Sequence, residues 1–285
     1  MKIKIVVCYH KPYKYISNEV YLPIHVGRTL SKLKLPIQGD DSGDNISNLN
    51  SLYCELTGLY WAWKNIDADY IGLCHYRRFF TFENNKLRNL IHKGYVKIQN
   101  IKGVFSKYPS SYSHKDEIIV NNEHLLIDKA YNASGKIKKF LTKNPNTLII
   151  ALKPVDFGFT NNQMLFSSVG GKFHLEIVRK IIAEKYPNLL DLYEKELLSN
   201  KLHFANMSVC SKKIIDEYCT FLFTILQEHS RIVINENWFI SLQERALGRI
   251  SGYIAEILTS TYISYIKKQY GNKSVKLLTL LRTQV

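Results

Sequence analysis

The sequence lacks both a long uncharged apolar run and any close pair of cysteines. No window approaches about eighteen uncharged apolar residues, so we expect no membrane-spanning helix. The N-terminal residues 1–8 carry lysines among their apolar side chains and contain no apolar core of signal-peptide length. The five cysteines form no C-x-x-C pair and are odd in number, which argues against a zinc ribbon and a disulfide framework. We therefore expect a protein of the reducing cytoplasm.

Acidic residues are scarce relative to basic ones. There are 24 Asp and Glu against 39 Lys and Arg, which gives 39 − 24 = +15, and such a charge attracts polyanions. Nucleic acid, an anionic membrane leaflet and a phosphate-bearing substrate all fit that sign. The sequence has neither zinc-finger spacing nor an RNP-type aromatic run, so nucleic acid is the least favoured of the three partners.

Short apolar runs alternate with helical patterns, which predicts an α/β fold. Residues 3–8 and 70–74 are typical of buried strands, and residues 51–65 place large apolar side chains at helical spacing. The section 83–134 is more hydrophilic and holds one strand-like stretch at 117–121. Helical spacing dominates the rest of the chain, in residues 173–185, 189–198, 214–227 and 238–266.

The C-terminal residues 267–285 combine lysines and Arg282 with regularly spaced apolar residues. This pattern is typical of a basic amphipathic helix at a membrane surface, and equally of a helix docked on the protein's own core. We find no repeat and no domain boundary before this tail. The sequence thus predicts a single domain over residues 1–266, followed by a basic amphipathic tail at 267–285.

Two polar clusters follow predicted strands directly. His10 and Lys11 follow the first strand, and the segment His75-Tyr76-Arg77-Arg78 follows the strand at 70–74. In open α/β sheets, ligands bind beyond the carboxyl ends of the strands. A guanidinium offers a planar fork of donors that matches phosphate oxygens, and a histidine can donate a hydrogen bond or a proton. These clusters therefore predict a pyrophosphate site, although paired arginines can also serve as surface ion-pair partners.

An acidic loop at residues 39–45 carries Asp40, Asp41, Asp44 and Asn45. It lacks the distal glutamate that an EF-hand calcium loop requires. A site for a divalent ion, or for the hydroxyls of a sugar or nucleoside, is one interpretation. A solvated turn whose side chains cap the following helix is the other.

A second acidic motif, Asp67-Ala68-Asp69, matches the DxD triplet with which many sugar-nucleotide transferases bind metal. In those enzymes the triplet follows a strand, whereas here it precedes one. We therefore expect it at the opposite edge of the sheet from the ligand.

Near the C-terminus, helical spacing places Arg245, Arg249, Tyr253 and Glu256 on one stripe. Such a stripe could bind a diphosphate and deprotonate an acceptor hydroxyl. It could equally form a surface ladder of salt bridges.

Several motifs, taken together and in order, resemble a bacterial family long labelled a domain of unknown function. Members of that family occur among proteins of capsule, exopolysaccharide and O-antigen (lipopolysaccharide) synthesis. The resemblance covers nearly the whole chain. The residues that carry it are 8–13, 39–47, 54–65, 72–80, Asn206-Met207, 218–223 and Gly252-Tyr253-x-x-Glu256.

The resemblance implies a GT-A-like nucleotide-sugar fold and, as in several relatives, transfer of galactofuranose from its UDP donor. By position, the family's HYRR motif is His75 to Arg78 and its late glutamate is Glu256. Its acidic loop falls on Asp40, Asp41, Asp44 and Asn45. Ser42 and Gly58, where threonine and alanine are common, are minor departures.

We therefore expect an inverting glycosyltransferase that acts at the cytoplasmic face of the membrane on a lipid-linked acceptor. Because HYRR occupies the strand end that usually carries DxD, cationic side chains are expected to neutralise the departing diphosphate without a metal cofactor. Glu256 is the first candidate for the base, Glu55 is the second, and His75 assists the leaving group. The expected donor-binding residues are His10, Lys11, Asp40, Asp41, Asp44, Asn45, Arg77, Arg78, Asn206 and Arg249.

Two alternatives remain open. One is a non-catalytic binding or scaffold protein of polysaccharide assembly that sits on the membrane through its positive charge. The other is an enzyme that transfers a phosphate-containing substituent instead of a sugar. Manganese or magnesium would be implicated if a chelator abolished activity.

Overall fold

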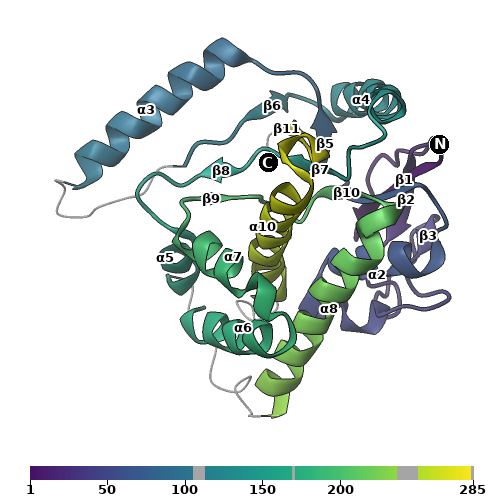
Figure 1. Ribbon diagram of the computed structural model, residues 1–285. Helices are drawn as coiled ribbons and strands as arrows, with labels where there is room; N and C mark the ends of the chain where they lie inside the picture. The colour runs from purple at the N-terminus through teal and green to yellow at the C-terminus, as the bar shows by residue number, and fades with distance from the viewer. Residues whose placement is uncertain (105–112, 169–170, 236–249, 284–285) are drawn as a thin grey trace.

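The computed structural model describes residues 1–104, 113–168, 171–235 and 250–283, which form a central sheet flanked by helices (Figure 1). The expected α/β fold is confirmed. Within the described residues the sheet has nine strands, eight of them in the order β10-β7-β11-β5-β4-β1-β2-β3, with β6 paired to β11.

One half of the sheet is parallel. It consists of β1 (Ile3–Tyr9), β2 (Tyr21–His25), β3 (Gln38–Gly39) and β4 (Tyr70–His75). Two of the strands expected from the sequence are β1 and β4, and their side chains are buried on both faces, as is usual for parallel strands. All four strands run in the same direction, so their carboxyl ends meet at one edge.

The other half of the sheet is mixed, and its strands come from distant parts of the chain. They are β5 (Arg78–Thr81), β6 (Glu117–Val120), β7 (Ile149–Leu152), β10 (Ser208–Ser211) and β11 (Val275–Thr283). Strand β10 runs antiparallel to both β4 and β7, while β11 hydrogen bonds with β5, β6 and β7.

The prediction of an amphipathic helix over residues 267–285 is wrong. Helix α10 (Ile250–Tyr270) runs past the predicted boundary, the short helix η3 (Asn272–Ser274) follows, and β11 then crosses the sheet. Most side chains of β11 are buried, and its backbone pairs with three other strands. A short apolar run does not reveal by spacing alone whether it is a strand or a helix. The lysines scattered among these apolar residues resemble the polar face of an amphipathic helix, which is why the pattern favours a helix.

Helices cover both faces of the sheet. On one face, α4 (Glu123–Lys143) packs on the odd-numbered side chains of β1, such as Ile5 and Val7. The opposite face carries the larger layer. Its helices are α1 (Asn50–Tyr53), α2 (Leu56–Asn65), α5 (Asn162–Ser167), α6 (Lys172–Lys185), α7 (Pro187–Leu198), α8 (Lys212–Asn235) and α10, with the short helix η1 (Ser47–Leu49) before α1.

The helices predicted at 173–185, 189–198 and 214–227 correspond to α6, α7 and α8. Of the region 238–266, the structure describes α10 from Ile250 onward, and residues 238–249 lie outside the described residues. A small second sheet pairs β8 (Val155–Asp156) with β9 (Lys201–Leu202).

Helix α3 (Lys86–Val104) differs from the other helices because it extends away from the rest of the molecule (Figure 1). The sequence did not predict it. None of the helices in the described ranges combines the length and apolar character that crossing a bilayer requires.

Candidate active site

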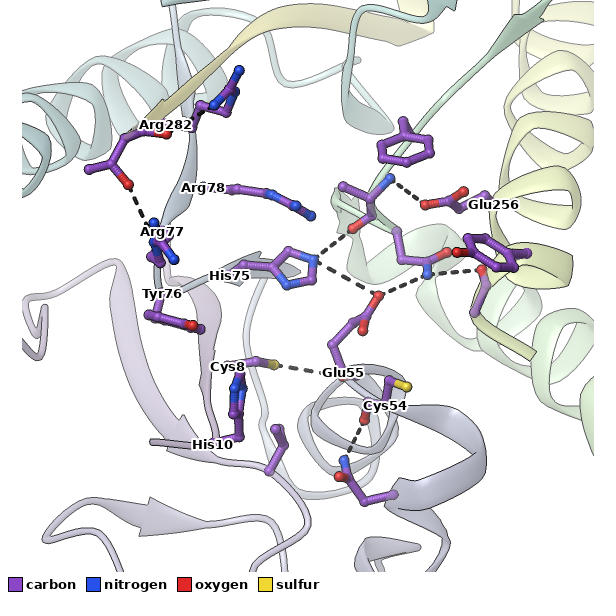
Figure 2. Close-up of a pocket in the computed structure, with 18 residues that line it drawn as sticks. Cys8, His10, Cys54, Glu55, His75, Tyr76, Arg77, Arg78, Glu256 and Arg282 are labelled. Carbon is purple, nitrogen blue, oxygen red and sulfur yellow. Dashed lines mark hydrogen bonds and ion pairs between the residues drawn. The ribbon is translucent and has the colours of Figure 1, made fainter. Parts of the chain in front are cut away.

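A cavity of about 520 Å³ opens at the carboxyl ends of the parallel strands (Figure 2). Cys8 near the end of β1, Val26 just after β2 and His75 at the end of β4 all line it. The opposite wall comes from Glu55 before α2, the residues ahead of β10, and α10. The complete lining is Cys8, His10, Val26, Asn50, Cys54, Glu55, His75, Tyr76, Arg77, Arg78, Phe204, Ala205, Asn206, Gly252, Tyr253, Glu256, Arg282 and Thr283.

The segment His75-Tyr76-Arg77-Arg78 forms a tight hairpin between β4 and β5. His75 and Arg78 pair across the two strands, so Tyr76 and Arg77 make the turn. The Tyr76 ring lies 5.7 Å from that of Tyr9, 5.3 Å from that of His10 and 5.0 Å from that of Tyr13. These aromatic contacts fix the turn against the end of β1, so the motif is held rigidly at the mouth of the cavity.

Three arginines meet at this hairpin, and one of them was not predicted as a site residue. Arg282 of β11 pairs in register with Arg78 of β5. The guanidinium of Arg282 is held by Glu117, at 2.7 Å, and Arg77 donates to the hydroxyl of Thr283 at 3.3 Å. Arg282 reaches the hairpin because residues 275–283 form a strand. The sequence predicted a helix there and therefore did not identify Arg282 as a site residue.

Arg78 is the cation that extends into the cavity (Figure 2). Its side chain points toward the wall that carries Glu256. Among the described residues we find no hydrogen bond or ion pair within 4.0 Å that engages its guanidinium. An unengaged guanidinium inside a cavity is a ready site for an anion, because its fork of donors matches phosphate oxygens.

The peptide unit of Ala205 is held between two of the predicted catalytic residues. His75 Nε2 lies 2.9 Å from the Ala205 carbonyl oxygen, and the Ala205 amide donates to Glu256 Oε1 at 2.7 Å. A carbonyl oxygen only accepts, so Nε2 is the protonated ring nitrogen of His75. Ala205 and Asn206 have φ angles of 73° and 51°, a left-handed conformation that these flanking hydrogen bonds stabilise.

Glu256 is a buried carboxyl group in the cavity with a raised pKa. Burial raises its pKa to about 8; the nearby Glu55 also raises it, while the hydrogen bond from Ala205 and the cations Arg78 and Lys115 lower it. Its side chain is only 5% exposed. A carboxyl group with a pKa close to neutrality can accept and release a proton at cellular pH, which suits general acid or base catalysis.

Glu55 reaches the same cavity from the start of α2. Its Oε1 accepts from Asn206 Nδ2 at 3.0 Å and lies 3.9 Å from His75 Nε2. The Nδ2 of Asn206 also donates to the Gly252 carbonyl at 3.1 Å. The other end of this amide, Asn206 Oδ1, is buried and has no hydrogen-bond donor among the described residues. The structure thus brings His75, Glu55, Asn206 and Glu256, four of the expected site residues, together in one cavity.

The acidic loop does not reach the cavity. Asp40 is fully buried, and its carboxylate accepts four hydrogen bonds within the protein. The donors are the amides of Gly27 and Arg28, at 2.9 and 3.1 Å, and the hydroxyls of Ser47 and Thr57, at 2.5 and 2.6 Å. These contacts tie the loop to the turn after β2 and to α2. The structure therefore gives Asp40 a role in the fold rather than contact with a ligand.

Replacing Asp40 with alanine is expected to destabilise the protein by roughly 3–5 kcal/mol, because two amides and two hydroxyls would lose their buried acceptor. Thermal unfolding measures this loss. Asp41→Ala serves as the matched control, since Asp41 makes only a partly exposed ion pair with Arg28 at 3.7 Å. A fully stable Asp40→Ala protein that had lost nucleotide-sugar binding would return Asp40 to the ligand site.

The remaining loop residues also bind within the protein. Asp44 accepts from the hydroxyl of Tyr60 at 3.1 Å, and the Asn45 side chain donates to the Gly43 carbonyl at 2.9 Å. Lys11 lies outside the cavity lining, with its ammonium 5.8 Å from the ring of Tyr76. Arg245 and Arg249 lie outside the described residues.

The DxD triplet lies at the opposite edge of the sheet, as predicted. Asp69 accepts from the amide of Lys2, just before β1, and Asp67 forms an exposed ion pair with Lys212 at 2.6 Å. Both contacts are at the amino ends of the parallel strands, away from the cavity.

A second, smaller cavity of about 210 Å³ adjoins the first and shares Arg78, Phe204, Ala205 and Arg282 with it. Lys115 and Lys153 also line it. Lys153 lies 3.5 Å from Asp116, and burial lowers the pKa of Lys115. The two cavities together surround Arg78 with further cations.

This chain is similar to one protein family and to a solved glycosyltransferase structure. The sequence profile of a family described as a domain of unknown function (DUF4422) matches residues 4–269. No curated protein matches the chain. Among solved structures, the apo structure of the bifunctional glycosyltransferase WbbM is similar, with 25% sequence identity and a TM-score of 0.77. The match covers 100% of this chain and 46% of that one, so this chain spans about half the length of WbbM.

Proposed function

This chain belongs to the family described as a domain of unknown function (DUF4422), and from its cavity and its similarity to WbbM we propose that it is a glycosyltransferase. It moves a sugar from a nucleotide donor to a glycan acceptor. The observation that carries the proposal is Arg78, an unengaged guanidinium in a carboxyl-end cavity that also holds a buried carboxyl group, Glu256. The similarity to WbbM supports the same activity.

In this proposal the donor lies in the larger cavity, whose volume falls in the range of about 300–1,000 Å³ that is usual for small-molecule sites. Arg78 binds the diphosphate, and Arg77 and Arg282 reinforce the positive field. Asn206 also lines the cavity, where its Nδ2 donates to Glu55 and holds that carboxylate beside the donor. His10 lines the same cavity.

The reaction breaks the bond between the anomeric carbon and the diphosphate oxygen, and the electron pair leaves with the nucleoside diphosphate. Arg78 stabilises the charge that develops there. The acceptor hydroxyl oxygen forms the new bond to the anomeric carbon, and its proton passes to the ionised carboxylate of Glu256. A direct displacement of this kind inverts the anomeric centre. His75 acts as a positioning residue, since its Nε2 hydrogen holds the Ala205 carbonyl.

The finer specificity rests on the resemblance described above, from which we infer UDP-galactofuranose as the donor. The acceptor is a lipid-linked glycan of capsule or O-antigen synthesis, presented at the cytoplasmic face of the membrane. We infer an anionic acceptor from the adjoining cavity, because Lys115, Lys153 and Arg282 line it next to Arg78 and outnumber its single carboxylate, Asp116.

Transfer is expected to proceed without a divalent metal, because arginine side chains carry out the neutralisation that a metal performs elsewhere. The initial rate should be the same in EDTA as in buffer with manganese. A rate abolished by EDTA and restored by manganese would contradict this prediction and direct attention to the carboxylates Glu55 and Glu256 of the cavity.

The proposed function is tested by incubating the protein with a lipid-linked acceptor and either UDP-galactofuranose or another nucleotide sugar. Mass spectrometry then gives the masses of the products. We expect the acceptor to gain the mass of one sugar while nucleoside diphosphate is released. A gain that includes phosphate would instead identify a substituent transferase. Absence of any product and of any nucleotide-sugar binding would favour a scaffold protein.

A further inference from the structure

Helix α3 carries a row of large apolar side chains that face solvent. Six of them are between 45% and 70% exposed, an unusual density for the surface of a soluble fold. Apart from the adjacent pair Leu90 and Ile91, they recur at intervals of three and four residues over about four turns of helix, roughly 21 Å. This apolar stripe consists of Leu87, Leu90, Ile91, Tyr95, Ile98 and Ile101.

The stripe faces away from the protein. Val96 and Asn100, which are 5% and 4% exposed, form the face that contacts the body of the molecule. Val96 follows Leu87 by nine residues, about two and a half turns, so the two side chains lie on opposite faces. Asn100 packs against Gly158, and His92 Nδ1 lies within hydrogen-bonding distance, 2.9 Å, of His114 Nδ1. The helix is thus held from one side, and Figure 1 shows it projecting from the fold.

Only positive charges accompany the stripe. Between residues 86 and 104 there are five lysines and arginines and no aspartate or glutamate. All five are exposed, and they lie along both flanks of the stripe. The cations are Lys86, Arg88, Lys93, Lys97 and Lys102.

We propose that α3 is a membrane-docking helix that lies in the plane of an anionic lipid bilayer. Its apolar stripe enters the boundary between headgroups and acyl chains, and the flanking cations contact the lipid phosphates. A second copy of the chain is a poor occupant, because pairing two such helices would bring ten positive charges together on molecules that each carry +15. Docking through α3 would bring the cavity to the membrane surface that carries the lipid-linked acceptor of the proposed function.

Vesicle co-sedimentation tests the proposal directly. The protein should bind vesicles that contain phosphatidylglycerol and bind vesicles of phosphatidylcholine alone far more weakly. The double variant Leu90→Asp/Ile98→Asp is expected to lower the partition coefficient on the order of a hundredfold, since it removes two large apolar contacts. Lys93→Gln/Lys97→Gln should lower it roughly thirtyfold on the anionic vesicles only.

Matched controls use residues of the same kind elsewhere on the surface. Met164→Asp/Leu198→Asp changes two exposed apolar residues, and Lys136→Gln/Lys139→Gln removes two exposed charges from α4. Both should bind vesicles like the wild type. The side chains changed on α3 make no buried contacts, so unchanged thermal unfolding is expected for its variants as well.

Three results would overturn the proposal: no binding of the wild type to anionic vesicles at low salt, equal binding of Leu90→Asp/Ile98→Asp, or a dimer in solution that this variant dissociates. The last would show that a second copy covers the stripe. Vesicle binding requires neither donor nor acceptor sugar, so this experiment tests the membrane-docking proposal independently of the proposed transferase activity. Binding of a nucleotide sugar in solution should be unaffected by the α3 variants.

Discussion

Replacing Arg78 with alanine is expected to lower the transfer rate by about 10²–10³-fold and to remove most of the affinity for a nucleotide sugar. Arg78 extends into the cavity. By contrast, Arg77 already donates a hydrogen bond to Thr283, and Arg282 already forms an ion pair with Glu117. Without Arg78, the developing diphosphate charge loses its closest fork of donors. Steady-state kinetics and calorimetric donor binding measure the two losses.

The control for this prediction is Arg231→Ala, which removes an exposed guanidinium paired with Glu228 on α8. It should leave both donor binding and transfer unchanged. Arg78→Lys keeps the charge but not the planar fork, so it should recover only a small part of the lost activity. An Arg78→Ala enzyme with unaltered donor affinity would remove Arg78 from the diphosphate site.

Replacing Glu256 with glutamine is expected to reduce transfer by about 10²–10⁴-fold while donor affinity is kept. Glutamine retains an oxygen that can accept from the Ala205 amide, so the backbone around Ala205 should not move. What is lost is the group that receives the acceptor proton. Single-turnover rates with saturating donor, compared with donor affinities, separate the two effects.

The matched comparison is Glu55→Gln. Glu55 binds Asn206 and lies near His75, so its replacement should act mainly on donor affinity and less on the maximal rate. An active Glu256→Gln enzyme together with an inactive Glu55→Gln enzyme would transfer the role of base to Glu55.

The raised pKa of Glu256 also predicts two pH effects. The carboxyl must be ionised to accept a proton, so the transfer rate should rise with pH through about 8 and then level off. A rate that falls over the same range would identify Glu256 as a proton donor instead.

Stability is expected to change with pH in the opposite sense. A carboxyl whose pKa is raised in the folded state holds its proton there more tightly than in the unfolded chain. The favourable contribution of this group to the free energy of unfolding is fully present below pH 4.5 and is lost as the pH rises through about 8. Glu256→Gln should therefore become more stable than the wild type at high pH, by a few kcal/mol at most, with no difference near pH 4. Equal pH profiles of thermal unfolding would contradict the raised pKa.

Features encoded in adjacent residues were predictable from the sequence. An apolar run that ends abruptly in His75-Tyr76-Arg77-Arg78 marks both a buried strand and the position of its ligand-facing end. The same rule placed Asp67 and Asp69 at the wrong edge for catalysis, and the structure agrees. The helix stripe that contains Glu256 was also correct where it is described, since α10 carries it to the cavity.

Features that depend on long-range pairing were not predictable. The tail was read as a helix because its apolar spacing is ambiguous, and only pairing of β11 with β5 brings Arg282 opposite Arg78. For Asp40 the loop pattern left both a ligand site and a solvated turn open, and the family resemblance favoured the ligand site. Its four donors come from residues up to 17 positions away, and no local pattern reveals them.

The central claim is that a nucleotide sugar binds in the cavity at the ends of β1 and β4, in contact with Arg78. A thermal-shift screen with UDP, GDP, CDP and dTDP sugars tests it most directly, because a ligand that binds only the folded state raises the melting temperature. We predict that at least one donor raises the melting temperature of the wild type and leaves that of Arg78→Ala unchanged. No shift with any donor, or the same shift in both proteins, would contradict the claim.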